Sequence, residues 1–592
     1  MYSRELGAMG ASGVRARPDI PVSRSRGRRV HNSHGTTPVD GMCDGRPWTA
    51  TISKKQGNRP KKHGLNRVLL AMSLMLASVY PAIPRALAET QAGHRGLRFP
   101  IHAYRVIGNS LLKANEITRI LEPYTGSQRS FADIEAAREA LQKAYRRAGY
   151  SAVEVVLPGQ ELNGGIVTLR VVEARVVSVQ VTGSPSYNRA NVLHSLPALV
   201  VGQVPNMRKI NEDLALANGN PGKFTSVLLR SGVQPNTIDA SVDVKATKPW
   251  RTFLTLNNSS NAPAGNFLIG AGYQYANVAN RDQVLTLQYI TSPDHPDTVS
   301  AYGAGYHIPL YHLGDSLDLF AGYANINAGT VAQLFSVSGK GSVFGLHYNQ
   351  HLNDTAGYKQ KVIYGIDYRA YRDDASYAGT PIGADVTVHP LSLAYGGLYQ
   401  GAQSRCGFTI TGMQNIAGGS HGSSADFSQA RLGATADYRL LRITTDCRRS
   451  IPARWQIRFQ GSGQYTSQEL VPSEQFGLGG LQSVRGFEER QFTGDKGIQG
   501  SFELYTPGFG RTLPIKRATL RALAFYDAGY VSLNDAQPGD IAHTAISSVG
   551  VGLHLNVAPH MDLELDYAHI LRAGESGLAD RNRIQGSLTL VD

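Results

Sequence analysis

Long apolar segments are nearly absent from this chain of 592 residues. One apolar run covers Val68–Val79, and after Ala88 no segment approaches about 18 consecutive apolar residues, so no membrane-spanning helix is predicted there. Cysteine is also scarce, with three residues in all, and only Cys406 and Cys447 lie after Ala88. That number suits an exported protein with at most one disulfide.

Basic charge is missing from the part of the chain expected to fold, although the whole chain carries a formal charge of +14. Residues 1–67 hold 14 Lys or Arg against four acidic residues, and Arg85 adds one more positive charge. The remaining 504 residues therefore carry only +3. A nucleic-acid-binding protein concentrates its basic residues in the folded domain. We therefore expect no nucleic-acid partner.

The stretch 61–88 has the three parts of a secretory signal peptide in order. A basic region, Lys61–Arg67, precedes the apolar run Val68–Val79, and Ala86–Ala88 supplies the small residues of a cleavage site. Because the apolar run is shorter than the about 20 residues of a membrane helix, we predict cleavage after Ala88, with a membrane anchor as the alternative. Residues 1–60 are then a basic disordered leader or a mis-assigned start.

Two stretches of mixed helix and strand follow, 99–175 and 176–248. The first reads as a strand, two helices and a hairpin, and its second helix opens with Ser130 and Asp133 in capping-box spacing. From residue 176 the same order of elements recurs. We predict two small α+β modules in tandem, with a single mixed domain as the alternative.

Residues 249–592 alternate between apolar and polar residues and contain no convincing amphipathic helix. The segment "MDLELDY" at 561–567 is typical. A soluble sandwich would turn its apolar residues inward, whereas an outer-membrane barrel turns them toward lipid and its polar residues toward the lumen. We count 16 alternating segments, an even number with alternately short and long connections. The prediction is an all-β transmembrane barrel of 16 antiparallel strands, surrounded by outer-membrane lipid.

The longest connection, 468–497, lies between the eleventh and twelfth strands and contains "GLGGLQSVRGFEER". Its glycines do not form a phosphate site, because a strand and not a helix follows them. On the thirteenth strand Asp527 has the parity of a lumen-facing residue and is flanked by Phe525 and Gly529. If the loop folds back into the barrel, Arg485 can pair with Asp527. A solvated loop arginine is the alternative.

The segments "GLGGLQSVRGF" and "FYDAG" resemble the two signature motifs of the superfamily of outer-membrane transporters and insertases that join POTRA modules to a barrel. Within it, two modules and 16 strands are similar to the two-partner-secretion transporters, which export haemolysins and filamentous haemagglutinins. The resemblance implies that Val484, Arg485, Gly486 and Phe487 form the tip of a loop inserted in the lumen, and that Arg485 pairs with Asp527.

The same resemblance implies a function. A monomeric outer-membrane pore would capture an unfolded exoprotein through its N-terminal secretion domain and pass it across the membrane. A barrel-assembly insertase shares the motifs but usually carries more modules, and a diffusion porin would need no modules. Both remain alternatives.

Cys406 begins the ninth strand and Cys447 ends the tenth, so both lie at the periplasmic rim of one hairpin. A disulfide between them is plausible, and two free thiols are the alternative. No nucleotide motif or metal cluster is apparent, so we expect no cofactor and no bound metal. The lumen-facing His554 lacks a recognisable Ser or carboxylate partner by spacing, and we expect no catalytic activity.

Overall fold

The computed structural model describes residues 97–592 except 163, 184–185, 259–264, 298, 326–328, 332–334, 338–339, 356, 373–375, 378–379, 382–383, 510–514, 516 and 576–580. The predicted leader, 1–60, and signal peptide, 61–88, lie outside the described residues. In the described part, no helix has the length and apolar character needed to cross a membrane.

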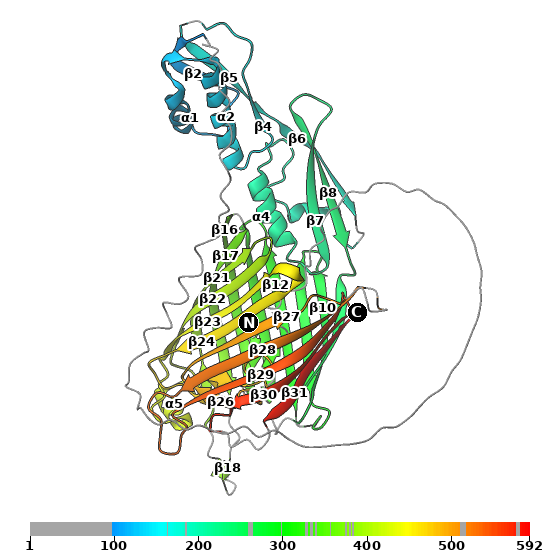
Figure 1. Ribbon diagram of the computed structural model, residues 1–592, viewed down its shortest axis with the longest axis vertical. Coiled ribbons are helices and arrows are strands. Elements are labelled where there is room, and N and C mark those ends of the chain that lie inside the picture. The colour runs from blue at the N-terminus through cyan, green and yellow to red at the C-terminus, as the bar shows by residue number, and fades with distance from the viewer. Residues whose placement is uncertain are drawn as a thin grey trace, which may run out of the picture. The chain divides into compact units, whose positions relative to one another are not determined.

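The first module is a three-stranded sheet covered by two helices (Figure 1). Strand β5 lies in the middle, parallel to β2 and antiparallel to β4. The predicted capping box at the start of α2 is present, because both the backbone N–H and the hydroxyl of Ser130 donate to Asp133. The core lies between helices and sheet and includes Leu141, Tyr145 and Leu169. The bounds are β2 Ala103–Ile107, α1 Ala114–Leu121, α2 Phe131–Arg147, β4 Val153–Val156 and β5 Ile166–Glu173.

The second module repeats this arrangement, with β8 between a parallel β6 and an antiparallel β7. Asn188 and Asn206 cap its two helices through their side-chain oxygens, which accept hydrogen bonds from backbone N–H groups of the first turn. The order of elements predicted from the sequence is therefore found in both modules. The bounds are β6 Arg175–Gly183, α3 Arg189–His194, α4 Met207–Ala217, β7 Lys223–Ser231 and β8 Thr237–Ala246.

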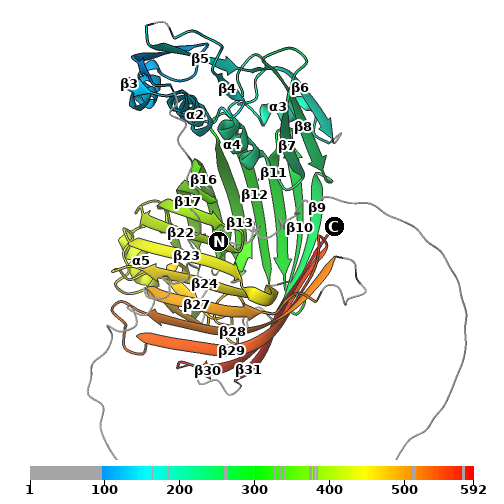
Figure 2. The same ribbon diagram turned by 45° about the horizontal axis from the view of Figure 1, so that its top comes forward.

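The rest of the described chain forms a closed antiparallel barrel (Figures 1 and 2), as predicted. Two consecutive segments, β20 and β21, both pair with β17 and together make one strand, so the wall has 16 strands. The bounds are β9 Trp250–Asn257, β10 Leu268–Val278, β11 Gln283–Thr291, β12 Ser300–Leu310, β13 Asp315–Asn325, β16 Lys340–Thr355, β17 Tyr358–Tyr371, β20 Val386–Val388, β21 Pro390–Gln400, β22 Ser404–Asn415, β23 Arg439–Ser450, β24 Gln456–Tyr465, β27 Lys496–Tyr505, β28 Ala518–Ser532, β29 His543–Val557, β30 Met561–Arg572 and β31 Asn582–Val591.

The two faces of the barrel wall differ in the way that a membrane protein requires. On β28, Tyr526 is 48% exposed on the outer face, whereas its neighbours Phe525 and Asp527 are buried toward the lumen. Large apolar residues are likewise exposed on other strands, and acidic residues such as Asp318 and Glu503 are buried. The alternation is the reverse of that in a soluble sandwich, whose apolar face is covered.

Several short elements were not predicted. Strands β1 (Phe99–Ile101) and β3 (Gly126–Arg129) pair in the first module, where both are too short to show a clear alternation. Helix α5 (Ser424–Ala430) lies in the loop between β22 and β23, in the region where the sequence shows no convincing amphipathic helix. Its seven residues make only two turns, and its signal is the local capping box of Ser423 and Asp426.

A buried ion pair joins β7 to the turn between β10 and β11. The Lys223 ammonium donates to Asp282 Oδ2 at 2.5 Å, and neither side chain is exposed. The Tyr311 hydroxyl and the Asn191 amide also donate to this carboxylate, at 2.7 and 2.9 Å. Burial lowers the pKa of Lys223, and the charge of Asp282 opposes that shift. The pair therefore depends on both partners being present, because either charge alone would be buried without compensation.

We predict that Lys223→Met opens this junction, because it leaves the Asp282 carboxylate buried without its cation, a loss that typically costs about 3–5 kcal/mol. The measurement is the rate of tryptic cleavage after Arg281, an exposed residue of the same turn. Cleavage should accelerate at least about a hundredfold, since about 1.4 kcal/mol corresponds to tenfold. Lys245→Met, which removes an exposed lysine of β8, is the control. The double variant Lys223→Met/Asp282→Asn should recover most of the resistance, and failure to do so would contradict the charge argument.

Candidate functional site

The candidate site is built on the loop between β24 and β27, residues 466–495. It begins and ends two residues earlier than predicted. A short 3₁₀ helix, Pro472–Glu474, leads into a small hairpin of β25 (Phe476–Leu478) and β26 (Phe492–Gly494). The hairpin carries the segment 479–491, which contains the motif. We call this segment the loop tip.

Arg485 of the loop tip lies against the barrel wall and is only 4% exposed. Its Nε donates to Asp527 Oδ2 at 2.7 Å and its Nη2 donates to Oδ1 at 2.8 Å, which is a two-point guanidinium–carboxylate contact. The backbone N–H of Arg485 donates to the same carboxylate at 3.1 Å. The structure therefore brings together the two residues that parity and the motifs paired, and Asp527 is fully buried.

The arginine has more partners than the sequence predicted. Its Nη1 lies 3.0 Å from Asp566 on β30, and its Nη2 lies 3.0 Å from Glu503 on β27. The Phe525 ring packs beneath the guanidinium carbon, 3.5 Å from its centroid. One cation is thus held among three carboxylates and one ring. Lysine, a point charge with three donors, could not make the same set of planar contacts.

The neighbours of Arg485 in the motif attach the tip in other ways. Val484 and Phe487 are fully buried in an apolar cluster with wall residues that include Val531 and Ile570. The Gly486 N–H donates to Gln585 on β31 at 2.6 Å, and that amide returns a hydrogen bond to the Phe487 carbonyl. Gly486 has φ +97°, which favours glycine, and a Cβ there would lie 3.1 Å from Ile570.

Gly529 of β28 provides the space that the tip occupies. A Cβ at this position would lie 2.6 Å from Leu478 Cδ2 and 3.3 Å from Val484 Cγ2. Phe525, Asp527 and Gly529 follow one another on the lumen side of one strand. Phe525 supplies a ring that packs on the guanidinium, Asp527 supplies the carboxylate that pairs with it, and Gly529 leaves room for Leu478 and Val484.

Glu503, Asp566 and Gln585 were missed in the sequence. Each lies on a strand adjacent to, or within three strands of, Asp527. In the sequence they are charged or amide residues at lumen-facing positions of the alternating segments "SFELY", "MDLELDY" and "NRIQGSL". Their position on the lumen side could not show that they contact the loop tip, because many lumen-facing residues are polar.

His554 corrects one expectation. We expected no carboxylate partner, but its Nε2 lies 3.4 Å from Asp566 Oδ1. The two residues are on neighbouring strands, and register pairs His554 with Glu564, so Asp566 is the diagonal neighbour. Spacing along one strand could not reveal this contact. Among the described residues no group of His, Cys, Asp and Glu is arranged to hold a metal ion.

Cys406 and Cys447 lie directly opposite each other in the register of β22 and β23, and they form a disulfide with a Cα–Cα distance of 4.0 Å. Both lie close to the short connections 401–403 and 451–455, away from the long loop that joins the two strands. The bond therefore links strands that are already hydrogen-bonded neighbours.

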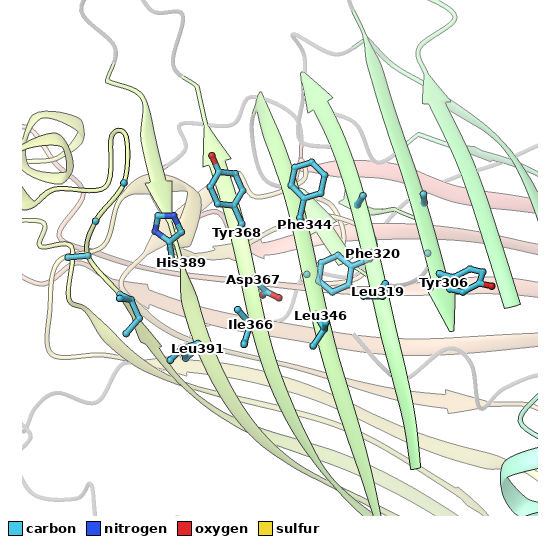
Figure 3. A pocket seen from close by; sticks show the side chains of 18 of the residues that line it. Tyr306, Leu319, Phe320, Phe344, Leu346, Ile366, Asp367, Tyr368, His389 and Leu391 are labelled. Atoms are coloured by element: carbon cyan, nitrogen blue, oxygen red, sulfur yellow. The ribbon is translucent and has the colours of Figure 1, made fainter. Parts of the chain in front are cut away.

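A hollow of about 890 Å³ on the barrel wall is not part of this site (Figure 3). The labelled side chains come from neighbouring strands of the part of the wall between β12 and β21, whereas the loop tip contacts β27, β28, β30 and β31. Phe344 and Ile366 in it are 53% and 59% exposed on the outer face. We interpret the hollow as part of the lipid-facing surface.

A closed barrel with an apolar exterior, an ion-paired loop inside its lumen and two preceding α+β modules defines an outer-membrane transporter of the POTRA-plus-barrel class. A family model described as haemolysin secretion/activation protein ShlB/FhaC/HecB matches residues 237–555, and a ShlB-type POTRA domain model matches 99–174. The chain belongs to this haemolysin secretion/activation family. The resemblance stated from the motifs is confirmed.

Curated relatives and solved structures are similar to this chain over most of its length. The chain is similar to the heme/hemopexin transporter protein HuxB of Haemophilus influenzae, with 21% identity over 78% of this chain and 82% of that protein. It is 22% identical to the outer membrane transporter CdiB of Escherichia coli over 76% of each chain. The structure of CdiB from Escherichia coli has the same fold, with a TM-score of 0.71 at 18% identity, over 86% of this chain and 93% of that one. CdiB from Acinetobacter baumannii gives 0.64 at 16% identity, over 88% and 96%.

The chain is therefore a two-partner-secretion transporter of the outer membrane, with POTRA modules in the periplasm and a secreted exoprotein as its partner. Its family is one of transporters.

We predict that Gly529→Ala displaces the loop tip, because the added methyl group overlaps Leu478 in a packed cluster. Overpacking of this kind costs about 1–3 kcal/mol. Amide hydrogen exchange of residues 479–491 should therefore accelerate by about fivefold to a hundredfold. The matched control is Gly407→Ala on β22, where the added methyl group would find its nearest neighbour at 3.5 Å. Equal exchange in both variants would show that the gap at Gly529 is unimportant.

Proposed function

We propose that this chain captures one unfolded exoprotein in the periplasm through that protein's N-terminal secretion domain and passes it through the barrel lumen to the cell surface. One barrel forms one pore, so the unit that works is a monomer. The division into a leader (1–60), a signal peptide (61–88), two modules (99–175 and 176–248) and a barrel (249–592) belongs to this proposal.

Capture is assigned to strand edges of the modules. An extended segment can add to an edge strand through backbone hydrogen bonds, which give affinity with little demand on sequence. In the second module β7 is an edge of its sheet and is nine residues long. Phe224 and Leu228 are each about half exposed on it, which offers apolar contacts beside the backbone groups. This strand suits an unfolded apolar-rich chain.

The observation that carries the proposal is the contact between Arg485 and Asp527 inside the lumen. A 16-strand barrel is wide enough for a water-filled channel, and a long loop inside it has to be held in place to leave a defined path. Val484, Arg485, Gly486 and Phe487 are proposed to pin the loop to Phe525, Asp527 and Gly529, so that loop and wall act as one unit. Folding of the exoprotein outside the cell supplies the free energy for its export, since no nucleotide-binding motif is apparent in the sequence.

The function is tested by deleting the gene in its source bacterium and comparing the secreted and outer-membrane proteomes with those of the parent. We expect one large secreted protein to disappear while the outer-membrane profile stays intact. A general loss of barrel proteins would point to an insertase instead, and an unchanged secretome with altered solute uptake would point to a porin.

We predict that Arg485→Ala leaves insertion in the outer membrane intact but reduces secretion severely. Removing one partner of a buried ion pair costs about 3–5 kcal/mol, and about 1.4 kcal/mol already changes an equilibrium tenfold, so the tip should leave the wall in most molecules. Secreted cargo is quantified in the culture medium beside the amount of folded barrel in the membrane. Arg485→Lys should rescue only in part, because lysine lacks the planar fork. Arg572→Ala, at an exposed arginine of β30, is the control, and full secretion by Arg485→Ala would refute the role.

A further inference from the structure

A second buried ion cluster holds the same loop at a different place. Glu474, at the end of the 3₁₀ helix, is only 1% exposed. Its Oε1 accepts from Arg369 Nη1 and from the Tyr371 hydroxyl, both at 2.9 Å. Arg442 Nη2 lies 3.5 Å from Oε2. A carboxylate buried this completely is stable only with such partners, so this segment of the loop has its own attachment to the wall.

The two clusters contact different strands of the barrel wall. Counted from β9, and with β20 and β21 as one strand, β17 is the seventh strand of the wall and β30 is the fifteenth. Arg369 and Tyr371 are on β17, whereas Asp566, which contacts Arg485, is on β30. The contacts of Glu474 extend from the seventh strand to the tenth, where Arg442 of β23 lies, and those of Arg485 extend from the twelfth strand, β27, to the fifteenth. The loop therefore contacts two separate arcs of the closed wall.

Asp495 holds the two limbs of the loop together between these contacts. Its Oδ1 accepts from the Leu470 N–H at 2.9 Å and from the Gln475 amide at 3.4 Å, both on the ascending limb. Arg431, which follows α5, donates to it through Nη1 and Nη2 at 2.5 and 3.0 Å, and the Asn534 N–H donates at 2.7 Å. The base of the loop is thus tied to two neighbouring outer loops and does not depend on the Arg485 contact.

The two wall contacts have opposite polarity. The tip carries a cation, Arg485, to wall strands with three carboxylates. The 3₁₀ helix carries an anion, Glu474, to wall strands with two arginines. Exchanging the two would place like charges together in a buried site, which is strongly unfavourable. The charges therefore determine which part of the loop meets which side of the barrel.

We propose that Glu474 is a second positioning residue of the transporter, an anchor that holds the ascending limb on the β17–β23 side independently of the Arg485 anchor at the tip. Release of the tip alone leaves the limb attached to this wall, so the loop clears the lumen fully only when both anchors open. This rests on the proposed role of the loop as a pinned part of the pore.

The experiment measures the two anchors separately in the purified full-length protein, without cargo. Two cysteine reporters are introduced one at a time: Gln475→Cys, beside Glu474 and 6% exposed, and Ser483→Cys, in the loop tip. Cys43 is replaced by serine in every variant, and the other two native cysteines, Cys406 and Cys447, form a disulfide and do not react. Labelling by a small maleimide is followed in the parent, in Glu474→Gln and in Arg485→Ala. Glu469→Gln, at a carboxylate of the same loop outside the Glu474 cluster, is the matched control.

We expect Glu474→Gln to accelerate labelling at position 475 at least about tenfold, the effect of about 1.4 kcal/mol on a local opening equilibrium, and to leave position 483 unchanged. Arg485→Ala should do the reverse, and Glu469→Gln should change neither. The proposal is overturned if Glu474→Gln leaves position 475 slow, or if both positions accelerate together in either variant, because the loop would then be held as one body.

Folding is checked by the heat-dependent gel mobility of the barrel. If Glu474→Gln fails to fold, Tyr371→Phe removes one hydrogen bond of the cluster at nearly constant volume and should give a smaller acceleration at position 475 alone. No acceleration at that position would overturn the proposal. Because labelling does not involve cargo, a failure of the export hypothesis would appear in secretion and not in these rates.

Discussion

The hydrocarbon around a membrane barrel offers no hydrogen-bond partner to a strand backbone, so every strand has to be paired along both edges. In this protein the requirement is met when Ser587–Val591 of β31 pairs with Phe253–Asn257 of β9. Closure fixes which side of each strand is the lumen, because successive side chains point to opposite faces. A single alternating sequence then supplies an apolar surface for lipid and a polar wall inside. The charged residues that hold the loop are members of that inner wall.

A loop placed in such a lumen meets a surface that water can also reach, so apolar packing alone would not fix its position. The tip combines both kinds of contact. Val484 and Phe487 enter a small apolar cluster with wall residues, and this cluster lies beside the ion contacts of Arg485. The apolar cluster excludes water and thereby strengthens the ion contacts of Arg485, since charges attract more strongly where the local dielectric is low. The four residues of the motif thus make both kinds of contact side by side, and Gly529 on the wall leaves the space that the tip occupies.

Buried ion pairs are weak evidence for stability, because desolvation offsets much of their attraction, but they discriminate well between alternative placements. That property fits the loop of this transporter. Its cation meets a wall of carboxylates at β27, β28 and β30, and its Glu474 meets arginines at β17 and β23. A loop bound in the wrong position would bury its charges against wall residues of the same sign. A contact built in this way can also open without disturbing the barrel, whose own strands are held by backbone hydrogen bonds.

Local regularities in the sequence determined much of this protein. The two-residue alternation gave the number of strands and the lumen side of Asp527, the capping-box spacing located α2, and the motif of Arg485 indicated the family. Each of these signals lies within a few residues. The tertiary structure decided the rest, because the remaining partners are distant in the chain: Asp566 is 81 residues from Arg485, and Arg369 is 105 residues from Glu474. Which lumen residues meet across the pore depends on closure of the whole wall and on the path of the loop, and neither leaves a local pattern in the sequence.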